Sequence, residues 1–222
     1  MKNYKYYAVI TGLFSACLVI SNILDTKIFK VSTLDLPGGI ILFPIVYVFG
    51  DMLTEVYGYS SSRKVIWTGF GALVLMVIAS TIVKLLPSAS FWTLQSEYEH
   101  IIGKVPRIVA ASISAYFLGE FTNSFVLAKL KVKSDGKNMP VRFVASTFFG
   151  QFVDTTVFVL IAFAGSMAIG DLVSITVSGW LFKVIWEIIA LPITLPVVKW
   201  LKKVENEDYF DRDTNFNPFK IS

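Results

Sequence analysis

Cysteine, histidine and charged residues are all scarce in this sequence. It contains one cysteine and one histidine in 222 residues, and 16% of its residues are charged. Because a disulfide needs two cysteines, Cys17 cannot form one within the chain. His100 alone cannot build a zinc or di-iron site, which takes several ligands, so we expect neither a metal nor another cofactor.

The low charge also indicates the class of protein. Roughly a quarter of the residues in soluble domains are charged, whereas this chain is 55% hydrophobic, with a mean hydropathy of +0.65. That composition excludes a soluble monomer, and its apolar content excludes a disordered chain. The net charge of +4 does not indicate a nucleic-acid partner, because the cations lie between apolar runs rather than on one face of a soluble module.

Six apolar runs are long enough to cross a lipid bilayer, at about 20 residues per span. They cover residues 6–24, 40–57, 64–86, 105–129, 142–169 and 172–201. We therefore predict an all-α integral membrane protein, a bundle of six transmembrane helices over residues 1–203 with a short acidic, polar tail at 204–222. That length leaves no room for a separate catalytic or ATP-binding domain. Residues 25–37 end in a Pro-Gly-Gly turn signal and are expected to form a short hairpin or a re-entrant segment.

The lysines and arginines predict the orientation. With the N-terminus in the cytoplasm, the inner side carries fourteen of them, the outer side carries five, and Lys183 lies within a span. The positive-inside rule therefore predicts that both termini are cytoplasmic.

Six ionisable residues interrupt the apolar runs, at a cost of about 2.5 to 3.5 kcal/mol each at a helix centre. They are Asp51, Glu55, Glu120, Asp154, Lys183 and Glu187. Helical spacing places them on stripes with other polar side chains, and we expect the stripes to face one shared interior. The residues that extend the stripes are Tyr47, Ser112, Tyr116, Asn123, Thr147, Gln151 and Trp180.

A purely structural interpretation is the alternative. Lys183 and Glu187 stand four residues apart and could neutralise each other, and Asn123 and Gln151 could join helices by hydrogen bonds. That interpretation leaves four carboxylates without a basic partner inside the membrane. Arg107 and Arg142, at span ends, could offset at most two of them as gating or structural charges.

A cavity with excess carboxylate has two chemical uses. It can bind a cationic solute, or one with several N–H groups, since a carboxylate accepts two parallel N–H donors. It can also carry protons when burial favours the protonated acid. A transporter can use both.

One set of residues matches a known family. The second run carries Phe43, Pro44, Tyr47, Asp51, Glu55, Val56, Tyr57, Gly58, Tyr59 and Arg63. Further matches are Ser21, Asn22, Lys27, Pro106, Arg107, Ser112, Ala115, Tyr116, Gly119, Glu120, Asn123, Arg142, Ser146, Thr147, Asp154, Lys183, Glu187 and Pro192. In this order, over nearly the whole chain, they resemble the queuosine precursor transporters of the vitamin uptake transporter group.

The resemblance implies an importer in the cell inner membrane rather than an enzyme. Its substrates would be 7-deazaguanines, such as the 7-cyano and 7-aminomethyl precursors, or queuine. Asp51 or Glu55 would receive the edge of the base, whose adjacent N–H donors suit one carboxylate. The remaining expected binding residues are Tyr47, Phe43 and Tyr116 for stacking, with Asn22, Glu120, Asn123, Gln151, Asp154, Lys183 and Glu187.

Other functions stay open at this point. A substrate-capture subunit of an energy-coupling factor importer would also have six helices, and Ala8, Gly12 and Ala16 form a small-residue stripe that could meet a partner or pack within the bundle. An intramembrane enzyme is disfavoured, because the one histidine lies in a predicted loop and metal ligands are missing. Whether the bundle associates as a homodimer is left open.

Overall fold

The computed structural model describes residues 4–24, 26–31, 34–102, 106–165 and 167–220, and the chain is helical throughout most of them. The elements are α1 (Tyr7–Leu24), β1 (Ile28–Val31), β2 (Leu34–Pro37), the 3₁₀ helix η1 (Gly38–Ile41), α2 (Phe43–Tyr57), α3 (Tyr59–Leu85), α4 (Gln95–Ile102), α5 (Pro106–Lys133), α6 (Met139–Phe163) and α7 (Ile169–Glu205). The predicted helical class is therefore confirmed.

Each of the six apolar runs overlaps one helix, but the predicted count of six is not confirmed. The described residues form seven α-helices, because α4 lies in the segment expected to be a surface loop. Four of the described helices, α1, α3, α6 and α7, are long and apolar enough to cross a membrane. Helix α2 has only 15 residues, against the ~20 that a span needs. Six membrane spans, and the cytoplasmic placement of both termini, stay predictions.

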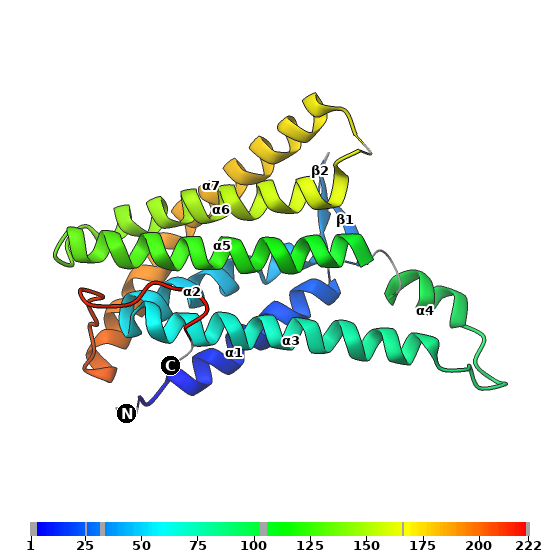
Figure 1. Ribbon diagram of the computed structural model, residues 1–222, viewed down its shortest axis with the longest axis horizontal. Coiled ribbons are helices and arrows are strands. Elements are labelled where there is room, and N and C mark those ends of the chain that lie inside the picture. The colour runs from blue at the N-terminus through cyan, green and yellow to red at the C-terminus, as the bar shows by residue number, and fades with distance from the viewer. Residues whose placement is uncertain (1–3, 25, 32–33, 103–105, 166, 221–222) are drawn as a thin grey trace.

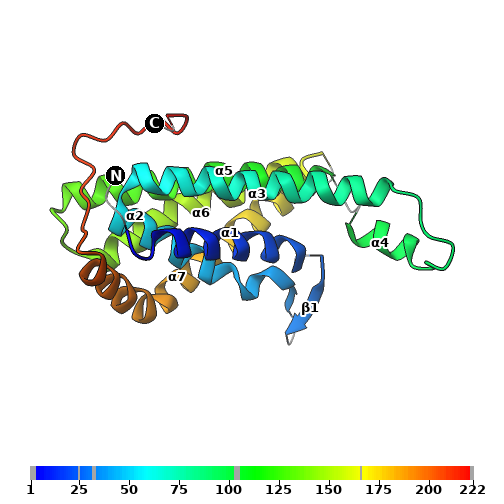
Figure 2. The same ribbon diagram turned by 90° about the horizontal axis from the view of Figure 1, so that it is seen from below.

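The long helices run roughly along one axis of the molecule. Helices α5 and α6 lie side by side, and α7 packs against α6 (Figure 1). The start of α1 and the C-terminal segment lie at the same end, which we call the termini end, whereas α4 lies at the opposite end (Figure 2). Large apolar side chains cover the outside of the helices, with Ile82 of α3 55% exposed and Ile189 of α7 59% exposed. Such an apolar surface suits contact with lipid rather than water.

The hairpin forms, but the Pro-Gly-Gly signal does not close it. Strands β1 and β2 pair antiparallel, with Ile28 opposite Pro37 and Val31 opposite Leu34. The residues between the strands, 32–33, lie outside the described ones. Pro37 instead ends β2, and η1 begins at Gly38. The turn signal therefore marks the step from the hairpin into α2.

The join between α2 and α3 depends on a glycine. Gly58 has φ +81° and stands alone between the two helices. A Cβ atom there would lie 2.3 Å from the Tyr209 ring. Only glycine combines this backbone conformation with so close an approach. The join thus brings the end of α2 and the start of α3 against the C-terminal segment.

The C-terminal tail, residues 206–220, is tied to the bundle. Helix α7 ends at Glu205, beyond the predicted boundary at residue 203, and Glu205 accepts hydrogen bonds from the backbone N–H groups of Lys5 and Tyr6 at 2.9 and 2.6 Å. In the tail, Asp211 accepts the N–H of Tyr59 at 3.0 Å. Both carboxylates satisfy donors that a helix start leaves unpaired. The tail therefore supplies a cap for α3.

Asp208 makes the stability of the tail depend on pH. Burial alone would raise the pKa of Asp208, but the ammonium groups of Lys131 and Lys202 bond to it and hold its pKa below the usual value. An acid whose pKa is lowered by folding stabilises the fold above its unfolded pKa, and loses that contribution as the pH falls towards the folded one.

We therefore expect the Asp208→Asn variant to have a lower melting temperature than the wild type at pH 7, with the difference shrinking between pH 5 and pH 3. Thermal melts of purified protein in detergent measure this. The exposed Asp213 is the matched control, and Asp213→Asn should follow the wild type at every pH. A constant gap for Asp208→Asn across that range would contradict the ion pairs.

Candidate functional site

Two glycines bring α5 and α6 into close contact at the middle of the bundle. A Cβ atom on Gly119 would lie 2.7 Å from the Cβ of Asp154, and one on Gly150 would lie 2.7 Å from the Cβ of Asn123. Atoms at these distances overlap, so both positions admit only a hydrogen. This crossing sets the polar side chains of α5 beside those of α6.

Four carboxylates and one lysine gather at this level, from four helices. We call them the carboxylate cluster: Asp51 of α2, Glu120 of α5, Asp154 of α6, and Lys183 and Glu187 of α7. Asp51 lies within electrostatic range of Glu187 and Glu120, and Glu120 within range of Asp154 and Lys183. The predicted shared interior is therefore present for these five residues.

Lys183 does not neutralise Glu187, although the two stand four residues apart. Its ammonium group instead forms an ion pair with Asp154 of α6. Glu187 is 3% exposed, and its Oε1 has no hydrogen-bond partner among the described residues. The proposed neutralisation within α7 is therefore wrong, and so is the inference that Asp154 lacks a basic partner.

Several buried oxygens of the cluster and its neighbours have no hydrogen-bond partner in the part of the chain that the structure describes. They are Asp51 Oδ2, Glu120 Oε2, Asn123 Oδ1, Thr147 Oγ1, Gln151 Oε1 and Glu187 Oε1. The Asn123 side chain is oriented by its amide, which donates to Asp51 Oδ1 at 2.8 Å. Buried polar atoms are nearly always paired. A group of unpaired acceptors therefore points to a ligand or a proton that donates to them.

Two of the expected aromatic residues lie at different places relative to the carboxylate cluster. Tyr47 is partly exposed and lies beside Gln151 and within electrostatic range of Glu120 and Asp154, so it borders the cluster. The hydroxyl of Tyr116 instead donates to the backbone oxygen of Ile66 in α3, at 3.3 Å. Its ring is 92% buried between α5 and its neighbours. Tyr116 is held by packing and faces α3.

Three further expected residues lie apart from the cluster or outside the described side chains. The Asn22 amide donates to the Leu18 backbone oxygen of its own helix, at 2.9 Å. The backbones of Phe43 and Arg107 are described as the starts of α2 and α5, but their side chains lie outside the described ones. Their expected roles in stacking and gating stay predictions.

Glu55, one turn beyond Asp51, belongs to a separate set of ion pairs at the termini end. Its Oε1 lies 2.6 Å from an Arg142 nitrogen, 2.6 Å from Lys202 Nζ and 3.9 Å from Lys131 Nζ. Asp208 of the tail binds both lysines. We call these five residues the Glu55 cluster. Arg142 therefore offsets this carboxylate, as a charge at a span end could, and Lys202 and Lys131 are partners that the sequence did not indicate.

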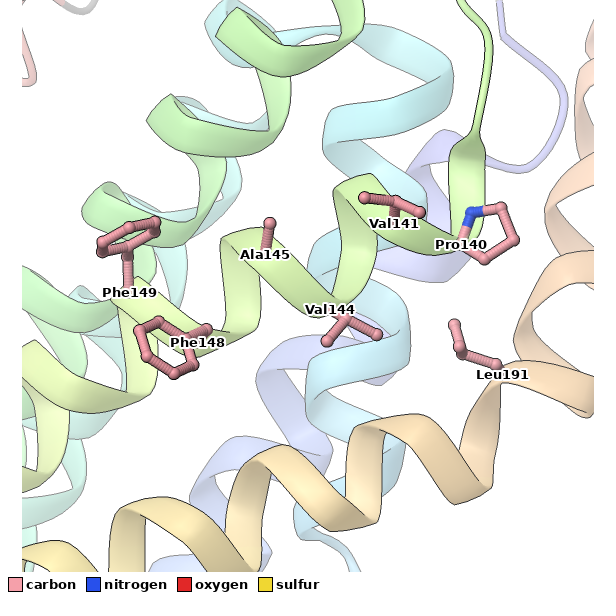
Figure 3. Close-up of a pocket in the computed structure, with 7 residues that line it drawn as sticks. All are labelled: Pro140, Val141, Val144, Ala145, Phe148, Phe149 and Leu191. Atoms are coloured by element: carbon pink, nitrogen blue, oxygen red, sulfur yellow. The ribbon is translucent and has the colours of Figure 1, made fainter.

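An apolar groove lies on the outer surface between α6 and α7, with a volume of about 420 Å³. Its lining includes Val144, Phe148 and Leu191, and Figure 3 shows these side chains between the two helices. No carboxylate lines it. The groove is therefore separate from the carboxylate cluster and suits apolar chains rather than a polar solute.

The comparisons with known proteins agree with a transport role. A family model described as "Putative vitamin uptake transporter" matches residues 37–197, more than half of the chain. The chain belongs to this vitamin uptake transporter family. With its several apolar helices, it is a multi-pass membrane protein.

Three curated relatives narrow the comparison. A protein of Bacillus subtilis named "Probable queuosine precursor transporter" is 26% identical over 84% of this chain and 82% of its own length. The "Queuosine precursor transporter" of Escherichia coli is 28% identical, over 56% of this chain and 54% of its own. A protein of Haemophilus influenzae, also named "Probable queuosine precursor transporter", is 30% identical over 56% and 51%. No solved structure matches the chain.

Sequence reasoning missed several residues that shape the bundle. Gly150, Lys131, Lys202 and Asp208 hold the bundle and its termini end together. The two lysines look like loop charges, because each follows an apolar run directly. Their role as ion-pair partners could be inferred only from a buried carboxylate that needs cations, and Glu55 is that carboxylate.

Proposed function

We propose that this chain imports queuosine precursors, 7-deazaguanine bases or queuine, across the cell inner membrane. The names of the three relatives support this substrate class, and the family supports transport. The proposal treats the carboxylate cluster, with Tyr47, Asn123 and Gln151, as the solute site. Catalysis forms no part of it.

One observation carries the proposal: most of the unpaired buried atoms around the cluster are carboxylate or amide oxygens, which accept hydrogen bonds. Carboxylate and amide oxygens have no partner there among the described residues. A 7-deazaguanine presents adjacent ring N–H and exocyclic amino donors, and one carboxylate can receive both. Asp51, held by Asn123 and fully buried, is our choice for this contact. Glu120 and Gln151 then receive the remaining donors.

Glu55 takes a different role in this proposal from the one expected from the sequence. Its Oε1 already binds three cations, so it is a poor receptor for a base edge. The Glu55 cluster closes the termini end of the bundle instead. We take that end as cytoplasmic, since the positive-inside count favours it. Arg142 then acts as a structural charge in this closure.

Uptake by cells that cannot make the precursor tests the proposal. We expect Asp51→Asn or Glu120→Gln, expressed at wild-type levels, to lower the queuosine content of tRNA about 10-fold or more, because a charge-assisted hydrogen bond contributes about 1.5–3 kcal/mol. Glu97→Gln, in the exposed face of α4, is the matched control. Wild-type queuosine levels in both site variants would remove these residues from the site.

The small-residue stripe of α1 gives a specific reason to test for a partner. Ala8, Gly12 and Ala16 are all exposed, and a Cβ on Gly12 would meet nothing within 4 Å, so the stripe does not pack within the bundle. A substrate-capture subunit would need an ATPase partner for uptake. We expect uptake in a host without any such ATPase module, which would exclude that role. Loss of uptake in that host would favour it.

A further inference from the structure

We propose that the carboxylate cluster selects a cationic solute over a neutral one of the same shape, and that the cation displaces a proton from the cluster when it binds. This inference rests on the proposed function and specifies the substrate within it. It makes the 7-aminomethyl precursor, which is a cation, the preferred solute over the neutral 7-cyano precursor.

The charges of the cluster do not balance. It has four carboxylates and one ammonium group, that of Lys183, which is paired with Asp154. Asp51, Glu120 and Glu187 are 0%, 4% and 3% exposed, and one oxygen of each has no hydrogen-bond partner among the described residues. A carboxylate in such surroundings needs a positive charge or a proton beside it.

The neighbouring groups whose side chains the structure describes do not supply enough positive charge. Beyond Asp51, the Glu55 cluster has three cations and two carboxylates, so it offers one surplus positive charge. If that charge balances one of the three carboxylates Asp51, Glu120 and Glu187, two of them still lack a positive charge. The other described groups near these acids are neutral: Tyr47, Asn123 and Gln151, with Tyr116 within electrostatic range of Glu120.

A second feature points to a ligand rather than to protons alone. The Asn123 and Gln151 oxygens are buried and have no donor among the described residues, so the site lacks hydrogen-bond donors as well as positive charge. A solute with several N–H groups can satisfy amide oxygens and carboxylates together. A cationic amine adds the missing positive charge, whereas a neutral nitrile adds none. The protons that balance the empty site must stay when a neutral solute binds, and one must leave when a cation binds.

The described residues also bear on metal ions as the balancing charge. In that part of the chain, no group of three or more His, Cys, Asp and Glu side chains is close enough to hold a metal. The acids come from four separate helices. We therefore assign the balance to protons and to the amine of the solute.

Binding to the purified full-length protein in detergent tests this inference, with 7-aminomethyl-7-deazaguanine and 7-cyano-7-deazaguanine as the two probes. Titration calorimetry in two buffers of different ionisation enthalpy counts the protons released. We expect about one proton released by the aminomethyl compound and none by the cyano compound. The aminomethyl Kd should then fall up to 10-fold for each pH unit between pH 6 and 8, since release of one proton links binding to pH with that slope.

Glu187→Gln gives the matched test at the site. By the charge count above, Glu187→Gln leaves one uncompensated carboxylate, so a bound cation should still release one proton. Adding Glu120→Gln removes that last one, and the double variant should release no proton, show a flat pH dependence and lose the preference for the cation at least several-fold. Glu97→Gln, on the exposed face of α4, should keep the wild-type behaviour. If Glu187→Gln does not fold, the wild-type comparison of the two probes in two buffers still decides the matter.

The outcomes separate this inference from the proposed function. Equal affinity for both probes, with no proton released by either, overturns the inference and leaves queuosine precursor transport in place. Binding of neither probe overturns the proposed function itself. Release of a proton by the aminomethyl compound alone supports both.

Discussion

Replacing Gly150 or Gly119 with alanine is expected to abolish uptake. Each added Cβ would lie 2.7 Å from a carbon of the facing helix, on Asn123 or Asp154. These contacts are between Cβ atoms fixed to the backbone, so the helices themselves must separate. Overpacking of this kind costs about 1–3 kcal/mol. Separation of α5 from α6 also moves Glu120 away from Asp154, so the loss of uptake should exceed the loss of stability.

Two other glycines provide a control, because alanine at these positions should have the opposite effect on stability. A Cβ on Gly71 of α3 or on Gly12 of α1 would meet nothing within 4 Å. Alanine favours a helix over glycine by up to about 1 kcal/mol, so Gly71→Ala and Gly12→Ala should leave melting temperature unchanged or raise it. Melts in detergent and uptake assays measure all four variants. Uptake by Gly150→Ala at the level of Gly71→Ala would show that the crossing does not position the site.

Replacing Glu55 with glutamine is expected to destabilise the protein by about 3–5 kcal/mol, the cost of leaving buried charges without their partner. Glu55 is fully buried, and Arg142, Lys202 and Lys131 all approach its Oε1. The variant leaves Asp208 alone to balance three cations. At roughly 2–4 °C per kcal/mol for a chain of this size, the melting temperature should fall by about 10 °C.

Glu97→Gln removes the same charge from the exposed face of α4 and should shift the melting temperature by less than about 2 °C, as surface changes do. Restoring balance offers a second check. Combining Glu55→Gln with Lys202→Gln removes one of the uncompensated cations and should recover part of the lost stability. A double variant no more stable than Glu55→Gln would contradict the assigned ion pairs.

Parts of the site could be predicted because they depend on local pattern. Asp51 and Glu120 each interrupt an apolar run, and the high cost of a charge in lipid marks them as residues that face a polar interior. In the structure, Asp51 lies within electrostatic range of Glu120 and Glu187, as a shared interior requires. The family motifs also include Asp51 and Glu120, so the cost of a charge in lipid and the family resemblance indicate the same two residues.

Other parts of the site could not be predicted, because they depend on which helices pack against one another. Glu55 and Asp51 look alike in the sequence, four residues apart on one face. Yet Glu55 lies beside cations that are 87 and 147 residues away, Arg142 and Lys202, while Asp51 meets an amide. The rotation and depth of four helices, α2, α5, α6 and α7, decide that difference, and no local pattern reports them.

The sequence by itself determined that this protein lies in a membrane and which segments form helices. It also identified the few charged residues that are costly to place in lipid. Hydrophobic burial and helical periodicity are properties of consecutive residues, so a single chain displays them. Only the tertiary structure decided which acids are balanced. Ion pairing needs two charges within a few ångströms, and the close crossing at Gly119 and Gly150 sets those distances. In our proposal, the carboxylates that the fold leaves without a positive partner are the ones that contact the solute.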